Sequence, residues 1–131
     1  MKKTGILNPD IIAAIAAMGH TDSLVIADAG LPVPEGVPCL DISLTRGIPS
    51  FIQALQAVAG ELVIESCITA AELPDKNPNI WKELQAALSG LPCEQVPHEM
   101  FKKRTAEAKA VIRTGETSPY ANVILIAGVN F

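Results

Sequence analysis

The sequence predicts an α/β protein in which a single three-layer domain, residues 1–131, holds an open, mostly parallel sheet with helices on both faces, in a Rossmann-like arrangement. Short apolar runs without polar alternation are typical of strands that are covered on both faces. Segments with apolar residues at helical spacing lie between these runs. A chain of 131 residues, 49% of them hydrophobic, is large enough to bury one core and too short to favour two domains.

The first helix and strand have the clearest boundaries. Asn8 is a preferred N-cap, the proline that follows it suits a first helical turn, and Gly19 is a preferred helix stop. Residues 23–28 form a continuous apolar run that ends in Asp28. We therefore expect a helix between Asn8 and Gly19, followed by a central parallel strand.

The remaining elements follow from similar signals. Gly60 and Gly90 each end a stretch of helical periodicity, and Asn77-Pro78 repeats the signature of a capped helix start. A connection rich in proline and glycine precedes the second strand. In order, we expect a strand at 39–44, a helix at 49–59, a strand at 61–65, a helix from 77 to 90, a strand at 93–96, a helix at 97–108, and strands at 110–113 and 122–126.

Charge and composition exclude several classes of function. The net charge of -4 gives no electrostatic basis for binding nucleic acid. No apolar run approaches the roughly 18 to 20 residues of a membrane span, and Asn8 to Asp10 interrupt any export signal behind the first lysines. The three cysteines show no Cys-x-x-Cys spacing, so we expect neither disulfides nor a zinc site, and a cytoplasmic location.

The motifs of cofactor-dependent enzymes are missing from the chain. It has no glycine-rich dinucleotide or nucleotide loop, no His-Glu-x-x-His helix and no serine elbow. We therefore expect no cofactor and no metal, and the chemistry that remains is proton transfer by side chains.

His20 is the first candidate for such a transfer, because imidazole exchanges protons near neutral pH. The partial negative charge at the end of the preceding helix favours the protonated ring, and Asp22 or Asp28 is a possible carboxylate partner. Asp28 either forms the turn into Gly30 or accepts a hydrogen bond from a ligand hydroxyl group. We expect His20 and Asp28 to reach a common crevice at one edge of the sheet, although an exposed histidine at a helix end is the simpler alternative.

His98 opens the helix predicted at 97–108, where the positive helix end favours the neutral ring. Lys102 lies one turn further along the same helix, so it reaches the same ligand if that face lines the pocket. A solvated lysine is the simpler interpretation of Lys102.

The only tyrosine, Tyr120, is followed by Ala121 and Asn122 in a polar loop that can bind sugar hydroxyl groups. These residues precede a strand, whereas Asp28 follows one. In an all-parallel sheet they would lie at the opposite edge. Either the last strand is antiparallel, or a neighbouring subunit supplies these groups.

Three blocks together carry a family resemblance: Met18-Gly-His-Thr-Asp22, Ile26-Ala-Asp-Ala-Gly30, and Arg113-Thr-Gly-Glu116 followed by Tyr120-Ala-Asn122. In this order and spacing they resemble the D-ribose pyranase family, and the likeness extends over nearly the whole chain. They are also similar to the related L-fucose mutarotases.

The resemblance implies an isomerase of carbohydrate metabolism that interconverts the β-pyranose and β-furanose forms of D-ribose without a cofactor. It implies that His20 is the proton donor and that Asp28, His98 and the segment from Tyr120 to Asn122 bind the monosaccharide. It also implies a homodecamer of two stacked pentameric rings, with sites near subunit contacts. The alternatives are a mutarotase of L-fucose or another sugar, and a ring protein that binds a sugar without catalysis.

Overall fold

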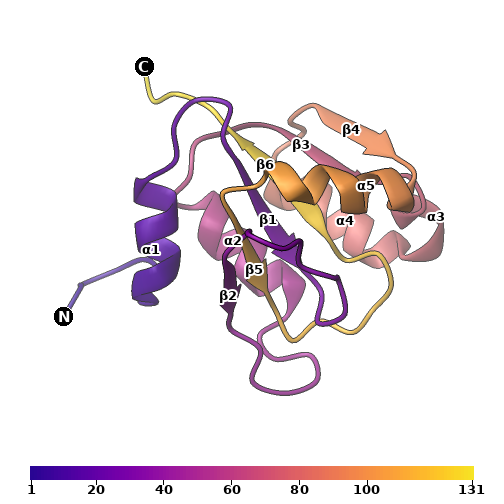
Figure 1. Ribbon diagram of the computed structural model, residues 1–131, viewed down its shortest axis with the longest axis horizontal. Helices are drawn as coiled ribbons and strands as arrows, with labels where there is room; N and C mark the ends of the chain where they lie inside the picture. The colour runs from indigo at the N-terminus through magenta and orange to yellow at the C-terminus, as the bar shows by residue number, and fades with distance from the viewer.

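The computed structural model describes residues 1–131 and contains one six-stranded sheet with helices on both faces, which confirms the predicted fold class (Figure 1). The strand order across the sheet is β2-β5-β1-β6-β3-β4. The strands are β1 (Ser23–Ala27), β2 (Cys39–Asp41), β3 (Ile64–Ala70), β4 (Cys93–Val96), β5 (Ala110–Arg113) and β6 (Val123–Ala127).

Strand β6 is the one strand that runs against the others. It is antiparallel to both of its neighbours, β1 and β3, whereas β1 with β5, β2 with β5 and β3 with β4 are parallel pairs. The prediction of a mostly parallel sheet is therefore confirmed. Of the two alternatives for the last strand, an antiparallel strand or residues supplied by a neighbouring subunit, the first is correct. Val123 at the start of β6 lies opposite Ile26 near the end of β1.

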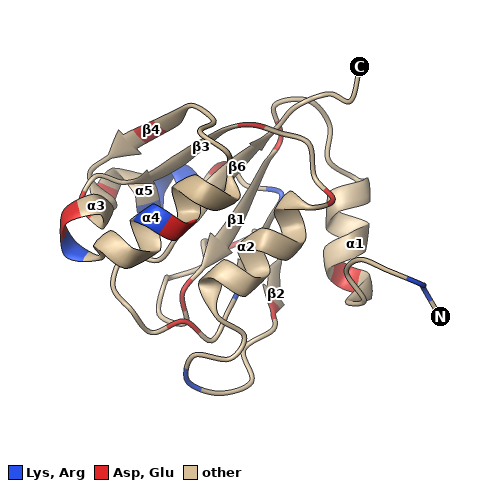
Figure 2. Cartoon of the chain, turned by 180° about the vertical axis from the view of Figure 1, so that it is seen from behind, with Lys and Arg blue, Asp and Glu red and all other residues tan.

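The helices are α1 (Pro9–Ala16), α2 (Phe51–Ala59), α3 (Leu73–Lys76), α4 (Pro78–Ala87), α5 (His98–Arg104) and the short 3-10 helix η1 (Thr105–Glu107). Helix α5 covers the face of the sheet seen in Figure 1, and α2 and α4 cover the opposite face, seen from behind in Figure 2. Successive β1 side chains alternate between two apolar clusters: Leu24 and Ile26 pack toward α2, and Val25 and Ala27 toward α5. Burying each of the three larger side chains, Leu24, Val25 and Ile26, stabilises the fold by about 1.5–3 kcal/mol.

Two helices begin at side-chain caps. The Asn8 carboxamide oxygen accepts hydrogen bonds from the backbone N–H groups of Asp10 and Ile11, at 3.0 and 3.1 Å. Ser50 and Gln53 form a reciprocal capping box at the start of α2. These caps satisfy N–H groups that the first turn leaves without a helical acceptor.

The expected boundary of the third strand was wrong. The strand predicted at 61–65 is β3, which begins at Ile64 and continues to Ala70. The backbone N–H of Leu62 still donates to Val58 at the end of α2, at 2.8 Å, so the residues after Gly60 extend the helical turn before the strand starts.

Other elements are shorter than expected. Strand β2 ends at Asp41, and α1 and α4 end at Ala16 and Ala87, each three residues before its glycine. The helix predicted at 97–108 gives way after Arg104 to η1, and the short α3 was not predicted. Boundaries of this kind depend on the last turn, where helical and tighter turns compete.

Charged side chains lie mainly on helices and loops, while β1 and β6 at the centre of the sheet carry none (Figure 2). Both central strands are almost entirely buried. A helix of the length and apolar character needed to cross a bilayer does not occur in this structure.

Gly115 lies where two segments of backbone meet. A Cβ atom at this position would collide with the carbonyl oxygens of Ile48 and Thr45, and backbone atoms cannot move aside cheaply. We expect Gly115→Ala to lower the free energy of unfolding by about 1–3 kcal/mol. Gly60→Ala is the control, because its Cβ would make only ordinary contacts of 3.5 Å. Chemical denaturation of both variants checks this, and equal stabilities would contradict it.

Candidate active site

Asp28 and Asn122 lie side by side because β1 ends where the reversed β6 begins. The backbone N–H of Asp28 donates to Asn122 Oδ1 at 2.8 Å, and Asn122 Nδ2 donates to Asp28 Oδ2 at 2.9 Å. Asn122 is only 1% exposed. These two hydrogen bonds fix the Asp28 carboxylate at the carboxyl end of β1, and one chain suffices to form the pair.

The second oxygen of Asp28 forms the turn that follows the strand. Oδ1 accepts from the N–H groups of Gly30 and Leu31, at 2.9 and 2.8 Å. The interpretation of Asp28 as a turn former is therefore correct. Asp28 can also accept a hydrogen bond from a ligand hydroxyl group, because a carboxylate has about four acceptor positions and only three are occupied here.

Tyr120 lies beside this pair in a tight turn. Its φ is 58°, and its carbonyl oxygen accepts from the N–H of Asn122 at 2.8 Å. Ala121, between them, is fully buried in the core on the α2 side of the sheet. Ala121 is 0% exposed, so its methyl group serves the packing of the core.

His98 joins the same edge of the sheet from the start of α5. Its ring meets Tyr120 edge to face, with centroids 5.1 Å apart, and stacks parallel to Phe101 at 6.3 Å. Its Nδ1 is buried and has no hydrogen-bond partner. A buried polar atom without a partner is costly, so this nitrogen is a natural partner for a ligand hydroxyl group. We call Asp28, His98, Tyr120 and Asn122 the polar cluster.

Lys102 lies one turn after His98 on α5, as expected from the sequence. Its ammonium group pairs with Glu99 at 2.8 Å, and its side chain is 31% exposed. The hydrogen bond and charge of Lys102 lower the pKa of the Glu99 carboxyl group. Both groups lie at the surface, so the pair contributes little stability and Lys102 can exchange this partner for another at small cost.

His20 lies away from the polar cluster, at the other end of β1. Its Nε2 lies 2.9 Å from Glu65 Oε2, and the two side chains are 53% and 42% exposed. The contact is an ion pair when the imidazole is protonated. Beside it is a hollow of about 300 Å³, formed by the end of α1, residues 61–63 and the C-terminal residues 127–131. We call His20 and Glu65 the donor end.

Two expectations about His20 were wrong. Its carboxylate neighbour is Glu65, because Asp22 is engaged by the N–H of Gly19 at 2.9 Å and by Lys109 at 3.6 Å. In addition, α1 already ends at Ala16, four residues before His20. The partial negative charge at the helix end therefore has little effect on the imidazole.

The common crevice expected for His20 and Asp28 does not exist within one chain. His20 precedes β1 and Asp28 follows it, so the five residues of the strand separate them by about 16 Å. The chain thus presents a group of polar side chains at one edge of the sheet and an imidazole at the other. One chain does not bring them into reach of one ligand.

Sequence reasoning missed two carboxylates. Glu65 holds His20, and Glu72 accepts from the backbone N–H of His98 at 3.1 and 3.2 Å. Glu72 follows β3 by two residues, at the edge where Asp28 follows β1. A correct end for β3 would have singled it out, because polar side chains after parallel strands gather at one edge.

The fold and the polar cluster define a class: small mixed α/β proteins that present a cluster of polar side chains at one edge of a largely parallel sheet. The chain belongs to the RbsD / FucU transport protein family, whose model matches residues 1–130. It is similar over its whole length to proteins named D-ribose pyranase. That of Bacillus licheniformis is 53% identical, with both chains fully covered, and that of Geobacillus kaustophilus is 50% identical, with 96% of the relative covered.

Solved structures lead to the same family. The structure of Bacillus subtilis RbsD complexed with D-ribose is 50% identical and superposes with a TM-score of 0.96, both chains being fully covered. The fucose mutarotase of Streptococcus pneumoniae in complex with L-fucose is 26% identical, with a TM-score of 0.82 and 95% of each chain covered. The chain is therefore more similar to the ribose-bound relative than to the fucose-bound one.

Proposed function

We propose that this protein is a D-ribose pyranase, which interconverts the β-pyranose and β-furanose forms of D-ribose without a cofactor. One observation carries the proposal: the chain matches the ribose-bound RbsD structure end to end, with 50% identity. The full-length similarity to several D-ribose pyranases supports the same substrate.

The reaction requires only proton transfers. The pyranose opens when its ring oxygen gains a proton and its anomeric hydroxyl group loses one, which gives the open-chain aldehyde. After rotation of the chain, the 4-hydroxyl oxygen attacks the aldehyde carbon and loses its proton. The carbonyl oxygen takes up a proton and becomes the new anomeric hydroxyl group of the closed furanose ring. General acid-base assistance at these steps contributes about 10² to 10⁴ in rate.

The donor end and the polar cluster divide this work. We assign His20 as the general acid that protonates the ring oxygen, and Glu65 as the group that orients its imidazole. Asp28, His98, Lys102, Tyr120 and Asn122 would hold the sugar hydroxyl groups, and the buried Ala121 would complete the binding segment between Tyr120 and Asn122. This division uses the unpartnered Nδ1 of His98 and the free acceptor position of Asp28.

A second copy of the chain would complete the site, since about 16 Å separates the two ends of β1. The rim of the hollow beside His20 supports this, because Val63 and Val129 are 43% and 39% exposed there. Exposed apolar side chains beside a functional group suit an interface between subunits. We propose a homodecamer of two pentameric rings, which light scattering on the purified protein would check by its mass.

We place the protein in the cytoplasm. All three cysteines are free, which fits a reducing compartment. Cell fractionation with an antibody against the native protein would check the location.

The substrate is tested by magnetisation-transfer NMR on equilibrated sugars. We expect the protein to accelerate exchange between the pyranose and furanose signals of D-ribose, and to act more weakly on the anomers of L-fucose. Faster exchange for L-fucose would favour the mutarotase alternative. Binding of D-ribose without accelerated exchange would favour a sugar-binding protein.

Glu65→Ala tests the orienting role of Glu65. The ion pair is half exposed, and pairs of this kind contribute about 0.2–1 kcal/mol, so we expect ribose exchange to slow about two- to fivefold at saturating ribose. Ribose affinity should be unchanged, because Glu65 would act through His20 and not on the sugar. Exchange kinetics at several ribose concentrations separate the two effects, and Glu83→Ala, at an exposed position of α4 outside the hollow beside His20, is the control. A loss of affinity with unchanged maximal exchange would contradict the assignment.

A further inference from the structure

Two cysteines face each other across β3 and β4. Cys67 and Cys93 are partners in the parallel register of these strands, so their side chains point to the same face of the sheet. Adjacent strands lie about 4.8 Å apart, within the range of Cα separations, roughly 4.4–6.8 Å, that a disulfide can bridge. Both thiols are free.

A cavity of about 350 Å³ opens onto this pair between the sheet and α4. Its apolar wall consists of Trp81 and Leu84 of α4 and of Leu88 and Leu91 in the connection after the helix, with Gln95 at the edge strand. Cys67 is 1% exposed, whereas Cys93 is half-buried on the edge strand β4. A small molecule that enters the cavity therefore meets Cys93 first.

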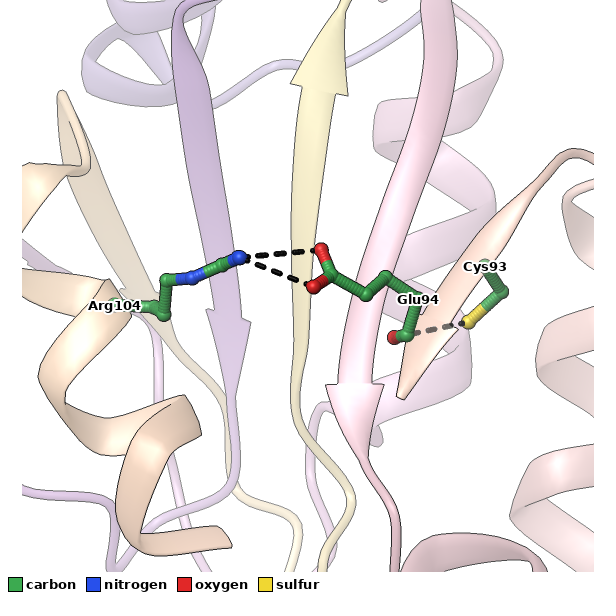
Figure 3. A network of polar contacts seen from close by, with 3 residues as sticks. All are labelled: Cys93, Glu94 and Arg104. Atoms are coloured by element: carbon green, nitrogen blue, oxygen red, sulfur yellow. Dashed lines mark hydrogen bonds and ion pairs between the residues drawn. The ribbon is translucent and has the colours of Figure 1, made fainter. Parts of the chain in front are cut away.

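The surroundings of Cys93 hold its sulfur in place. Figure 3 shows the Cys93 sulfur directed at the carbonyl oxygen of Glu94, 3.8 Å away, while the Glu94 carboxylate turns away to Arg104 at 3.1–3.2 Å. The Thr69 hydroxyl group contacts Cys93 Sγ from β3 at 3.6 Å. Neither Glu94 nor Arg104 is a charged neighbour on the cavity side, so hydrogen bonds dominate the environment of the sulfur.

The two thiols differ in acidity. The neighbouring Cys67 thiol, assisted by Thr69, lowers the pKa of Cys93 to about 7 against the opposing effect of burial. The neighbouring Cys93 sulfur, together with burial, raises the pKa of Cys67. Cys93 is thus the thiolate of the pair and Cys67 keeps its proton.

We propose that Cys67 and Cys93 form an oxidisable dithiol that reacts with peroxides entering the α4 cavity and closes to a disulfide. This is a modification site separate from the polar cluster and the donor end, and it requires no bound sugar. Cys93 is the attacking residue and Cys67 the resolving one.

The chemistry balances with a peroxide as the only oxidant. The Cys93 thiolate attacks one peroxide oxygen, the O–O bond breaks, and hydroxide leaves, which takes up a proton to form water; Cys93 becomes a sulfenic acid. The Cys67 sulfur then attacks the sulfenic sulfur, the S–O bond breaks, and a second water leaves with the thiol proton. Cellular thiols reverse the reaction by exchange, as expected for transient disulfides in a reducing compartment.

Cys39 provides an internal control. It is exposed on β2, at the edge of the sheet opposite to β4. Five strand spacings, about 24 Å, separate the two edges, so Cys39 cannot pair with either thiol of the same chain.

The first experiment treats the purified protein and Cys39→Ser with hydrogen peroxide and maps their peptides without reduction. We expect both proteins to lose two hydrogens in mass and to yield a Cys67–Cys93 linked peptide that disappears on reduction. A wild-type protein that keeps both thiols, or that forms disulfides only through Cys39, would overturn the proposal. This experiment substitutes no buried residue, and it does not measure ribose exchange. Its outcome is therefore independent of the proposed function.

The second experiment separates the two roles. Cys67→Ala should stop at the Cys93 sulfenic acid, which a dimedone probe captures, and Cys93→Ser should leave Cys67 reduced. In Cys39→Ser, the rate at which iodoacetamide labels Cys93 should rise with pH, with a midpoint at about pH 7. When Cys67 is removed as well, this midpoint should shift toward the ordinary thiol pKa of about 8.5. Equal peroxide reactivity of Cys67 in Cys93→Ser, or an unshifted labelling profile, would overturn the assignment of roles.

Discussion

His20→Ala is expected to slow the exchange between pyranose and furanose ribose by about 10² to 10⁴, because it removes the proposed general acid. His20 is 53% exposed, so the free energy of unfolding should change by no more than about 0.5 kcal/mol. Magnetisation-transfer NMR measures the exchange, and thermal unfolding with ribose titration checks fold and binding. Full exchange in the variant would remove His20 from its role and leave the family membership intact.

Asn122→Ala is expected to destabilise the protein and weaken ribose binding together. The change removes the acceptor of the Asp28 N–H and the donor to its carboxylate from a residue that is 1% exposed. We expect a loss of about 2–4 kcal/mol in the free energy of unfolding and at least about tenfold in ribose affinity. Denaturation and isothermal titration calorimetry measure the two effects.

The matched control for this variant is Asn79→Ala, which changes an exposed asparagine on α4. Its stability and affinity should remain close to those of the unchanged protein. Unaltered ribose affinity in Asn122→Ala would exclude Asp28 and Asn122 from sugar binding, even if the stability falls as expected.

The two variants together test the shared site. If His20 of one subunit works with Asn122 of its neighbour, random mixing of the two impaired variants gives about a quarter of the sites both residues. At ribose concentrations too low to saturate Asn122→Ala, exchange in the mixture should then exceed the mean of the two separate variants after the oligomers are dissociated and reassembled. If both residues act from the same chain, the mixture shows no such gain.

The sequence predicts those parts of the fold that depend on local signals. The Asn8 cap and the proline after it place the start of α1 correctly, and the uninterrupted apolar run of β1 predicts a central, fully buried strand. Strand direction is not encoded in such a run: β1 and β6 have nearly the same composition, yet they run in opposite directions. The apolar pattern of the last strand therefore could not decide between a parallel and an antiparallel direction.

The sequence identifies the individual candidate residues of the site, but it does not show which of them lie together in space. His20, Asp28, His98 and Asn122 stand out by type and by their place at element ends. Their grouping depends on the reversal of β6, which joins Asp28 to Asn122 and leaves His20 at the far end of β1. Glu65 escaped notice because it meets His20 across 45 residues, a distance over which local patterns carry no information.

The placement of β6 also bears on how the chain folds during synthesis. Strand β1 is made early, but both of its neighbours in the sheet, β5 and β6, come from residues 110–127, and β6 alone joins the half β2-β5-β1 to the half β3-β4. The ribosome must therefore release most of the chain before the buried apolar strand Ser23–Ala27 has a neighbouring strand. Strand pairings between residues so far apart in the sequence form slowly, and until they form the apolar strand remains exposed and prone to aggregation. The nascent protein should thus depend on holding chaperones until its last strand emerges.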